Sequence, residues 1–359
     1  MTRRPILNKT IFGLSSGDAH IAFFQGGAFM QSVRKLFIFA SLSLSLAILP
    51  IDLAYAQSSR THELKSPIRL IHGQAPGGTT DAMARLLSNE LAARLGLDVV
   101  VETRPGAGTT IAAATVARAP ADGQTLLFTG SGHSVNASLI PNLTFDTAKD
   151  FKAIGLVAST PYLLLTTPSM PVSTVAELLA YLKQHPDQAT VAVTSIGSSP
   201  HIAGALFRQK SGINMELVPY KGSSAQVADV ISGRVPIAFD NIALMGPHLE
   251  AKTLKPLAVT SKDRSPMYPD IPTMAESGFP DFDIVGWFGA LTPTNTPDTT
   301  VQIFSREIIN MKQDPSFIDQ VKKLGATVMP GGAAEAETFV QNDIKRMSQM
   351  VKALEIKLQ

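Results

Sequence analysis

The feature that most constrains this chain is a repeated unit in which an apolar strand leads into a loop of glycine, serine and threonine, and the loop leads into a helix. The clearest copy covers residues 67–95. Residues 67–72 are strand-like, and the apolar residues of 81–95 recur at spacings of three and four, which places them on one helix face. Thr79 or Thr80 is expected to cap this helix, and Gly96 to end it.

The same alternation continues along the chain. Further strands are expected at 98–102, 125–129, 189–194, 215–219 and 236–240. Further helices are expected at 110–118, at 174–182 with a Thr174/Glu177 capping box, and at 224–231, followed by C-terminal helices at 300–311, 315–324 and 334–354. Strands that alternate with helices predict βαβ units, so the expected fold class is α/β with a largely parallel sheet.

Three of the loops have a composition that suits an anion. They cover residues 74–81, 129–133 and 194–201. Glycines let the backbone approach a ligand, hydroxyls add hydrogen bonds, and a helix N-terminus offers unpaired N–H groups. Any one of them taken alone is better explained as an ordinary βα turn with capping residues. Three at the carboxyl ends of parallel strands favour a binding edge for a carboxylate.

Enzymatic motifs are missing from the sequence. The chain has no cysteine, which removes disulfides, thiolate metal sites and cysteine nucleophiles. It has no phosphate-binding G-x-x-x-x-G-K-[ST], no G-x-S-x-G around Ser131 or Ser198, and no G-x-G-x-x-G that opens a helix. Its histidines lack metal-site spacing. We therefore expect no catalytic residue, no metal site and no cofactor.

The N-terminal region resembles an export signal. Arg34 and Lys35 precede an apolar stretch at 36–49, which is shorter than a helix that crosses a bilayer core of about 30 Å. Small residues at Ala54 and Ala56 then form a cleavage signature, so we expect a signal peptide at 30–56, cut after Ala56, and a periplasmic protein. An uncleaved anchor is the alternative. Residues 1–29 are interpreted as a mis-annotated extension, with Met30 as the true start.

Removal of residues 1–56 changes the charge. They hold five of the 31 basic and two of the 29 acidic residues, which leaves 26 basic and 27 acidic residues, a net charge of −1. A nucleic-acid surface needs clustered lysine and arginine, and none is present, so no nucleic-acid partner is expected.

Eight motifs in order carry a family resemblance. They are APGGTTDAMARLL at 75–87, VETRPGAG at 101–108, SPHIAGALF at 199–207, VPYKG at 218–222, FDN at 239–241, LAVTS at 257–261, IPTMAE at 271–276 and GWFG at 286–289. From about residue 67 to the C-terminus, the chain resembles the substrate-binding family of tripartite tricarboxylate transporters, also called the Bordetella uptake gene family.

The resemblance implies a two-lobed periplasmic binding protein of the Venus flytrap kind, type II-like. Each lobe would have a mixed, mostly parallel sheet flanked by helices, with the ligand cleft between the lobes. Chain crossings are placed near 159–164 and 282–290. One lobe would then combine 57–158 with 281–359, and the other would be 159–280. A monomer is expected, with the integral membrane subunits of the transporter as partners.

The resemblance also implies the ligand-binding residues. Carboxylate recognition in the family uses backbone N–H groups, hydroxyls and bridging waters, and Asp81, itself anionic, would act through waters or by ordering its loop. The expected ligand-binding residues are Gln74, Ala75, Gly77, Gly78, Thr79, Asp81, Ser131 and His133 in one lobe, and Ser195, Ser198, Ser199, His201, Asp240 and Asn241 in the other.

One departure from the family pattern affects the expected ligand. The family often has Val-Pro-aromatic before the Pro-Gly-Gly loop, whereas this chain has His72-Gly73-Gln74. We interpret the pocket as more polar, or its solute as different. The expected function is capture of a small carboxylate and delivery to the transporter; a carboxylate sensor or an enzyme on the same scaffold is the alternative.

Overall fold

The computed structural model describes residues 64–357. The predictions about the extension at 1–29, the signal peptide at 30–56 and the cut after Ala56 lie outside these residues. Within 64–357, no helix combines the length and apolarity that a bilayer crossing requires.

The chain first builds a parallel three-stranded sheet. β1 (Ile68–His72) lies between β2 (Val99–Thr103) and β3 (Thr125–Gly130), and both pairings are parallel. The strands are linked by α3 (Thr79–Leu95) and by a short 3-10 turn η1 (Ala107–Thr109) that leads into α4 (Thr110–Ala117); α5 (Ser131–Leu139) follows β3. The buried face of α3 packs with the strands in one apolar core.

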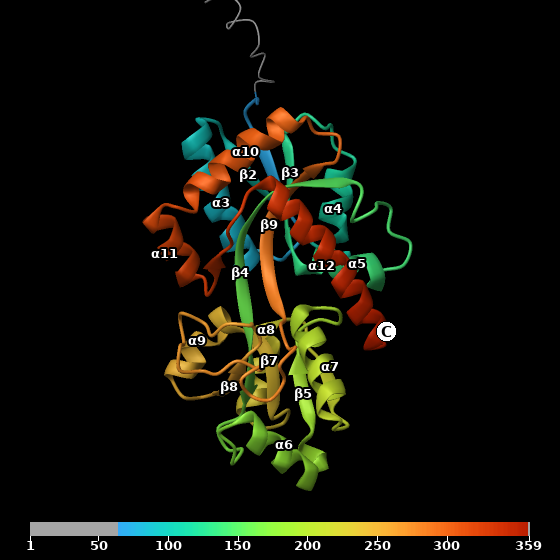
Figure 1. Ribbon diagram of the computed structural model, residues 1–359, viewed down its shortest axis with the longest axis vertical. Helices are drawn as coiled ribbons and strands as arrows, with labels where there is room; N and C mark the ends of the chain where they lie inside the picture. The colour runs from blue at the N-terminus through green and yellow to red at the C-terminus, as the bar shows by residue number, and fades with distance from the viewer. Residues whose placement is uncertain (1–63, 358–359) are drawn as a thin grey trace, which may run out of the picture. The chain divides into compact units, whose positions relative to one another are not determined.

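Two long antiparallel strands then connect this sheet to a second one (Figure 1). β4 (Phe151–Thr166) pairs with β9 (Val285–Pro293) from Phe151 to Pro161, and β9 in turn pairs with β3. From Tyr162 onward β4 instead pairs with strands of the second sheet. We call the ladders of β1, β2, β3, β9, β10 and the first part of β4 the first sheet, and the remaining ladders the second sheet.

The second sheet is again parallel at its centre. β5 (Thr190–Val193) lies between β6 (Glu216–Pro219) and β7 (Ile237–Asn241) in parallel register, and β7 and β8 (Lys255–Val259) pair antiparallel with β4. Its helices are α6 (Val175–Gln184), α7 (Ser199–Ser211), α8 (Ser223–Ile231) and α9 (Ile242–Glu250). A second short turn, η2 (Pro186–Gln188), precedes β5.

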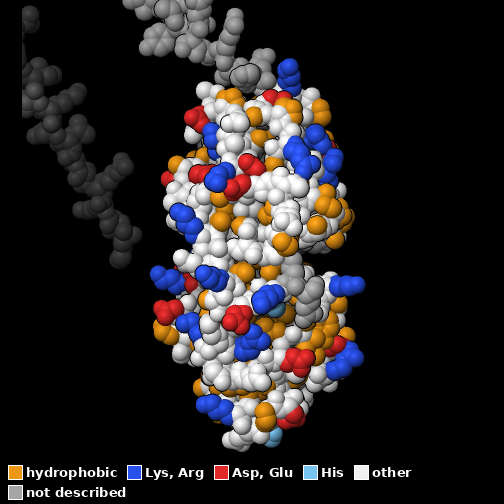
Figure 2. Space-filling model, turned by 90° about the vertical axis from the view of Figure 1, so that its right-hand side faces the viewer, with side chains coloured by type: hydrophobic (Ala, Val, Ile, Leu, Met, Phe, Trp, Pro, Cys, Tyr) orange, Lys and Arg blue, Asp and Glu red, His pale blue; other side chains and the backbone are white. Residues whose placement is uncertain are grey.

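The C-terminal helices return to the first sheet. α10 (Asp298–Met311), α11 (Pro315–Lys323), β10 (Thr327–Val328) and α12 (Ala333–Ala353) complete the described chain. The last turns of α12 reach further, because Met347, Val351 and Leu354 share one apolar core with α7 and the second sheet. Figure 2 shows basic and acidic side chains interspersed over the side of the molecule on which α4, α5 and the end of α12 lie in Figure 1, with a narrow waist near its middle.

The predicted α/β fold class is confirmed, and the expected strands and helices are present with ends that differ by at most two residues. Thr174 caps α6 as predicted, because its Oγ1 accepts from Glu177 N–H at 3.1 Å. The second half of the predicted capping box differs, since the Glu177 carboxylate accepts from Ser173 N–H at 2.6 Å and not from Thr174 N–H. The predicted cap of α3 was wrong: Gly78 occupies the N-cap, and helical geometry already begins at Thr79. The antiparallel ladders come from β4, β9 and β10.

Candidate functional site

The loop after β1 is held from within by Asp81. Its Oδ2 accepts hydrogen bonds from Gly77 N–H and from Arg85 Nε, both at 3.1 Å, and its Oδ1 lies 3.1 Å from His72 Nε2. Burial pushes the pKa of Asp81 upward, but hydrogen bonds from Arg85, Gly77 and His72 outweigh this and hold it below its ordinary value. Asp81 is therefore an ionised brace of the glycine loop.

The same loop is open on its outer side. Gln74, Ala75 and Gly77 are exposed, and Gly78 and Thr79 are half-buried. Gly77 has a φ of 83°, which favours glycine, and a Cβ there would meet nothing within 4 Å. The first N–H groups of a 17-residue helix follow directly, and these have no partner within the helix. The loop can therefore offer backbone donors and a positive dipole end to an anion.

Ser131 and His133 bond inward. Ser131 Oγ accepts from Trp287 N–H at 3.1 Å, which ties α5 to β9. His133 is 2% exposed; its Nε2 lies 3.0 Å from Thr147 carbonyl oxygen, and its ring packs edge-on against Phe151. Burial lowers the pKa of His133 to about 4, so the ring is neutral near pH 7 and donates to that carbonyl. Both side chains brace the end of β3.

In the second sheet, the loop before α7 is organised by Ser198. Its hydroxyl oxygen accepts from Thr194 Oγ1 at 2.8 Å and from His201 N–H at 3.2 Å, so Ser198 is the N-cap of α7. His201 Nδ1 accepts from Gly197 N–H at 3.2 Å. Burial, with the charge of Arg208, lowers the pKa of His201 to about 4, so its Nε2–H is a neutral donor. Ser195 is exposed at the tip, and Ser199 is buried.

Asp240 and Asn241 end β7. Asp240 is fully buried and accepts from Ser223 Oγ at 2.7 Å, from Gln226 Nε2 at 2.5 Å and from Asn241 N–H at 2.6 Å. Burial raises the pKa of Asp240 to about 6 against those hydrogen bonds. Asn241 caps α9 through Ala243 N–H at 2.8 Å. The structure therefore places Asp240 behind the loop that carries Ser223.

Two features escaped the sequence analysis. The loop at 220–224 repeats the strand–Gly/Ser–helix pattern, since Gly222 is the N-cap of α8 and Ser223 follows it; that pattern could have identified it. Tyr162 lies where β4 changes partner. Burial raises the pKa of Tyr162 to about 12, and a Cβ on Gly286 would come within 2.4 Å of its hydroxyl. No local pattern marks this tyrosine.

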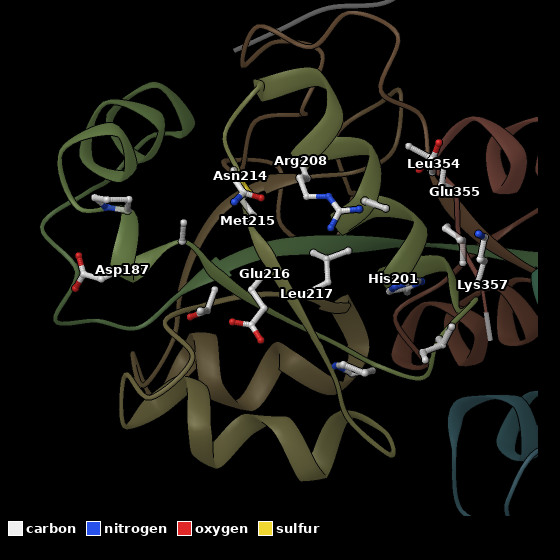
Figure 3. Close-up of a pocket in the computed structure, with 17 residues that line it drawn as sticks. Asp187, His201, Arg208, Asn214, Met215, Glu216, Leu217, Leu354, Glu355 and Lys357 are labelled. Carbon is white, nitrogen blue, oxygen red and sulfur yellow. The ribbon is translucent and has the colours of Figure 1, made fainter. Parts of the chain in front are cut away.

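A hollow of about 810 Å³ lies beside α7 and β6 and is bordered on one side by residues 354–357 (Figure 3). His201 is the one predicted ligand-binding residue that lines it. Its charged lining residues are of both signs: Arg208 and Lys357 against Asp187, Glu216 and Glu355. The hollow does not include the Gln74–Thr79 loop, so it is separate from the braced glycine loop.

The chemistry available is binding by neutral donors. In the part of the chain that the structure describes, no group of three or more His, Asp or Glu side chains could hold a metal ion. The N–H groups of Gly77, Gly197 and His201 already have acceptors within their own loops. The first N–H groups of α3, the exposed Ser195 hydroxyl and the imidazole Nε2–H of His201 are neutral donors that suit an anionic ligand.

Two α/β sheets joined by two long strands, with capped glycine and serine loops at the ends of the parallel strands, define a solute-binding protein of the periplasmic binding class. Residues 83–356 match the family described as Tripartite tricarboxylate transporter family receptor, and the chain belongs to this family, whose members are solute-binding receptors.

Individual relatives agree with this assignment. Protein BugT of Bordetella pertussis is 32% identical over 81% of this chain and 90% of its own length. The structure of an R. palustris protein with adipate has a TM-score of 0.74 and 33% identity, covering 81% of this chain and 98% of the other. MatC of Rhodopseudomonas palustris with bound malate has a TM-score of 0.70 and 29% identity, covering 80% and 99%.

Proposed function

We propose that this protein binds a small carboxylate in the periplasm, does not transform it, and delivers it to the membrane subunits of a tripartite tricarboxylate-type transporter. The observation that carries the proposal is the braced glycine loop, in which Asp81 holds Gly77 while the loop and the first turn of α3 remain open. Relatives of similar fold, solved with adipate and with malate, support a carboxylate as the ligand class.

The proposed site lies between two lobes, one of 57–158 with 281–359 and one of 159–280. Its ligand donors would be the Gln74–Thr79 loop on one side and the Ser195–His201 loop on the other. Asp81 supports the first of these loops, while Ser131 and His133 brace the nearby end of β3. Asp240 supports the loop that carries Ser223. Gln74, exposed where the family often has an aromatic residue, would make the pocket wall more polar. We also propose that a leader peptide is cleaved after Ala56 and that the mature protein is a monomer.

Calorimetric titration of the mature chain with a panel that includes adipate, malate and an amino acid tests the proposal. Saturable binding of at least one carboxylate, with no product after prolonged incubation, is expected. Gly78→Val adds bulk in open space beside the N-terminus of α3 and should weaken binding about tenfold or more. Ala334→Val, on an exposed first turn of α12, should bind as the wild type does.

Two results would count against the proposal: no carboxylate binds at millimolar concentration, or the bound compound is chemically converted. Delivery is tested separately. Deletion of the transporter's membrane subunits should abolish uptake of the bound solute and leave its binding by this protein unchanged. Undiminished uptake after that deletion would contradict the transport role.

A further inference from the structure

His72 ends β1 immediately before the glycine loop and is 0% exposed. Its Nε2 lies 3.1 Å from Asp81 Oδ1 and 3.1 Å from Thr103 Oγ1. The other carboxylate oxygen of Asp81 accepts from Gly77 N–H. Two consecutive hydrogen bonds therefore connect a buried imidazole to the backbone of the proposed ligand loop.

The hydrogen between His72 and Asp81 must belong to the imidazole, because an ionised carboxylate can only accept. With the proton on Nε2, Nδ1 keeps a lone pair. That atom is buried and has no hydrogen-bond partner. Protonation would place a second N–H where no acceptor lies, and burial accordingly lowers the pKa of His72 below its ordinary value.

The charged groups that act on the ring are few. Asp81 raises the pKa of His72, and Arg85, on the same helix as Asp81, lowers it. From β2, Thr103 offers only a hydroxyl, while the neighbouring Glu102 is engaged with Arg69 and with Arg104. The ring is therefore neutral near pH 7.

A buried nitrogen without a partner destabilises a fold, and an apolar side chain at this position would avoid that cost. The benefit of the imidazole must then come from Nε2, the atom that meets Asp81. Asp81 is also the acceptor for Gly77 N–H, so if its carboxylate could rotate, the position of Gly77 in the loop would be less fixed.

We infer that His72 is a positioning residue for ligand binding: its neutral imidazole donates to Asp81 and fixes the carboxylate that holds Gly77, so that the loop presents its N–H groups in one arrangement. The inference rests on the proposed function, because it assigns a purpose to the same loop. It extends that proposal by naming a residue that touches no ligand and sets the affinity.

The test compares His72→Gln, whose amide nitrogen can reach Asp81 without titrating, with His72→Val, which cannot donate. Hydrogen exchange of the amides at 74–79 without ligand, and the Kd for adipate and malate, are measured at pH 7.5. We expect the valine variant to exchange about tenfold faster in this loop and to bind about tenfold more weakly. The glutamine variant should stay within about threefold of the wild type in both. Thr103→Val, which removes the other neighbour of the ring, is the matched control and should also stay within about threefold.

Equal loop exchange in the valine variant and the wild type would overturn the inference, and so would equal acceleration in the valine and glutamine variants. If the valine variant fails to fold, Asp81→Asn replaces it and should accelerate loop exchange in the same way. If the wild type binds no carboxylate, the proposed function fails, while the exchange comparison still decides the role of His72.

Discussion

At the scale of single residues, buried titratable groups are distributed around the strand ends. His133 and His201 have pKa values lowered to about 4 by burial, whereas burial raises the pKa of Asp240 to about 6. Between pH 6.5 and 4 these two histidines are protonated in the unfolded protein and neutral in the folded protein. The free energy of unfolding therefore falls as the pH falls. Asp240 opposes this in part, because its folded form holds a proton up to about pH 6.

The contribution of His133 can be isolated by His133→Gln, which keeps a donor for the Thr147 carbonyl oxygen and does not titrate. We expect urea unfolding of the wild type to lose about 3 kcal/mol from this residue between pH 6.5 and 4, and the variant to lose correspondingly less. His185→Gln, at the exposed end of α6, serves as the control. Identical pH profiles for wild type and His133→Gln would contradict the assignment.

Which residues lie at the strand ends could be predicted from the sequence, but not where their side chains point. His133 and His201 both lie in the first turn of a helix that follows a strand, yet the His133 ring turns toward Thr147 and Phe151, whereas His201 accepts from Gly197 N–H in its own loop. Direction depends on partners distant in the chain, such as Trp287 for Ser131. Local composition contains no information about such partners.

At the scale of elements, a glycine at the end of β3 allows a close backbone approach. A Cβ on Gly130 would lie 2.2 Å from the Trp287 carbonyl oxygen on β9. Two positions later, Gly132 in the first turn of α5 has nothing within 4 Å. The two glycines are therefore a matched pair, one needed for strand packing and one free to change.

Gly130→Ala should destabilise the protein by about 1–3 kcal/mol, because the backbone of β3 or β9 must move. Gly132→Ala should leave the stability unchanged or raise it slightly, since alanine favours a helix. Denaturant unfolding of both variants measures the difference. A Gly130→Ala variant as stable as Gly132→Ala would show that β3 and β9 are not packed as described.

Most elements could be predicted because glycine and proline mark their ends; Gly96, in left-handed geometry with φ 66°, ends α3 as expected. The continuous 16-residue strand β4 could not be predicted in this way, because it contains Gly155 and Pro161, and glycine and proline normally interrupt strands. It persists because β9 pairs along its first part and β7 along its last. The continuous length of β4 therefore depends on tertiary pairing and not on its local sequence.

At the scale of the whole described molecule, α12 ties the second crossing strand to the first sheet. Trp287 Nε1 donates to Asp343 Oδ2 at 2.8 Å, and Arg346 donates to Asp343 Oδ1 and to the Asp283 carbonyl oxygen. Asp343 is 3% exposed. Its carboxylate therefore fixes α12 on the start of β9, where the chain returns from the second sheet to the first.

Asp343→Ala should destabilise the protein by about 3 kcal/mol, because it leaves the buried Trp287 N–H and a guanidinium without their acceptor. Asp319→Ala, on the exposed face of α11, is the control and should change stability by less than about 0.5 kcal/mol. Tryptophan emission, which comes from Trp287 alone, should shift in the first variant. An unchanged emission and unfolding midpoint would mean that this contact is not formed in solution.

Hydrogen exchange of the mature protein with and without a saturating carboxylate decides whether the two loops hold one ligand. Exchange should become slower at both the Gln74–Thr79 loop and the Ser195–His201 loop, because one ligand would contact both. Protection limited to the hollow beside Arg208, or to one loop alone, would contradict a site shared between the two sheets.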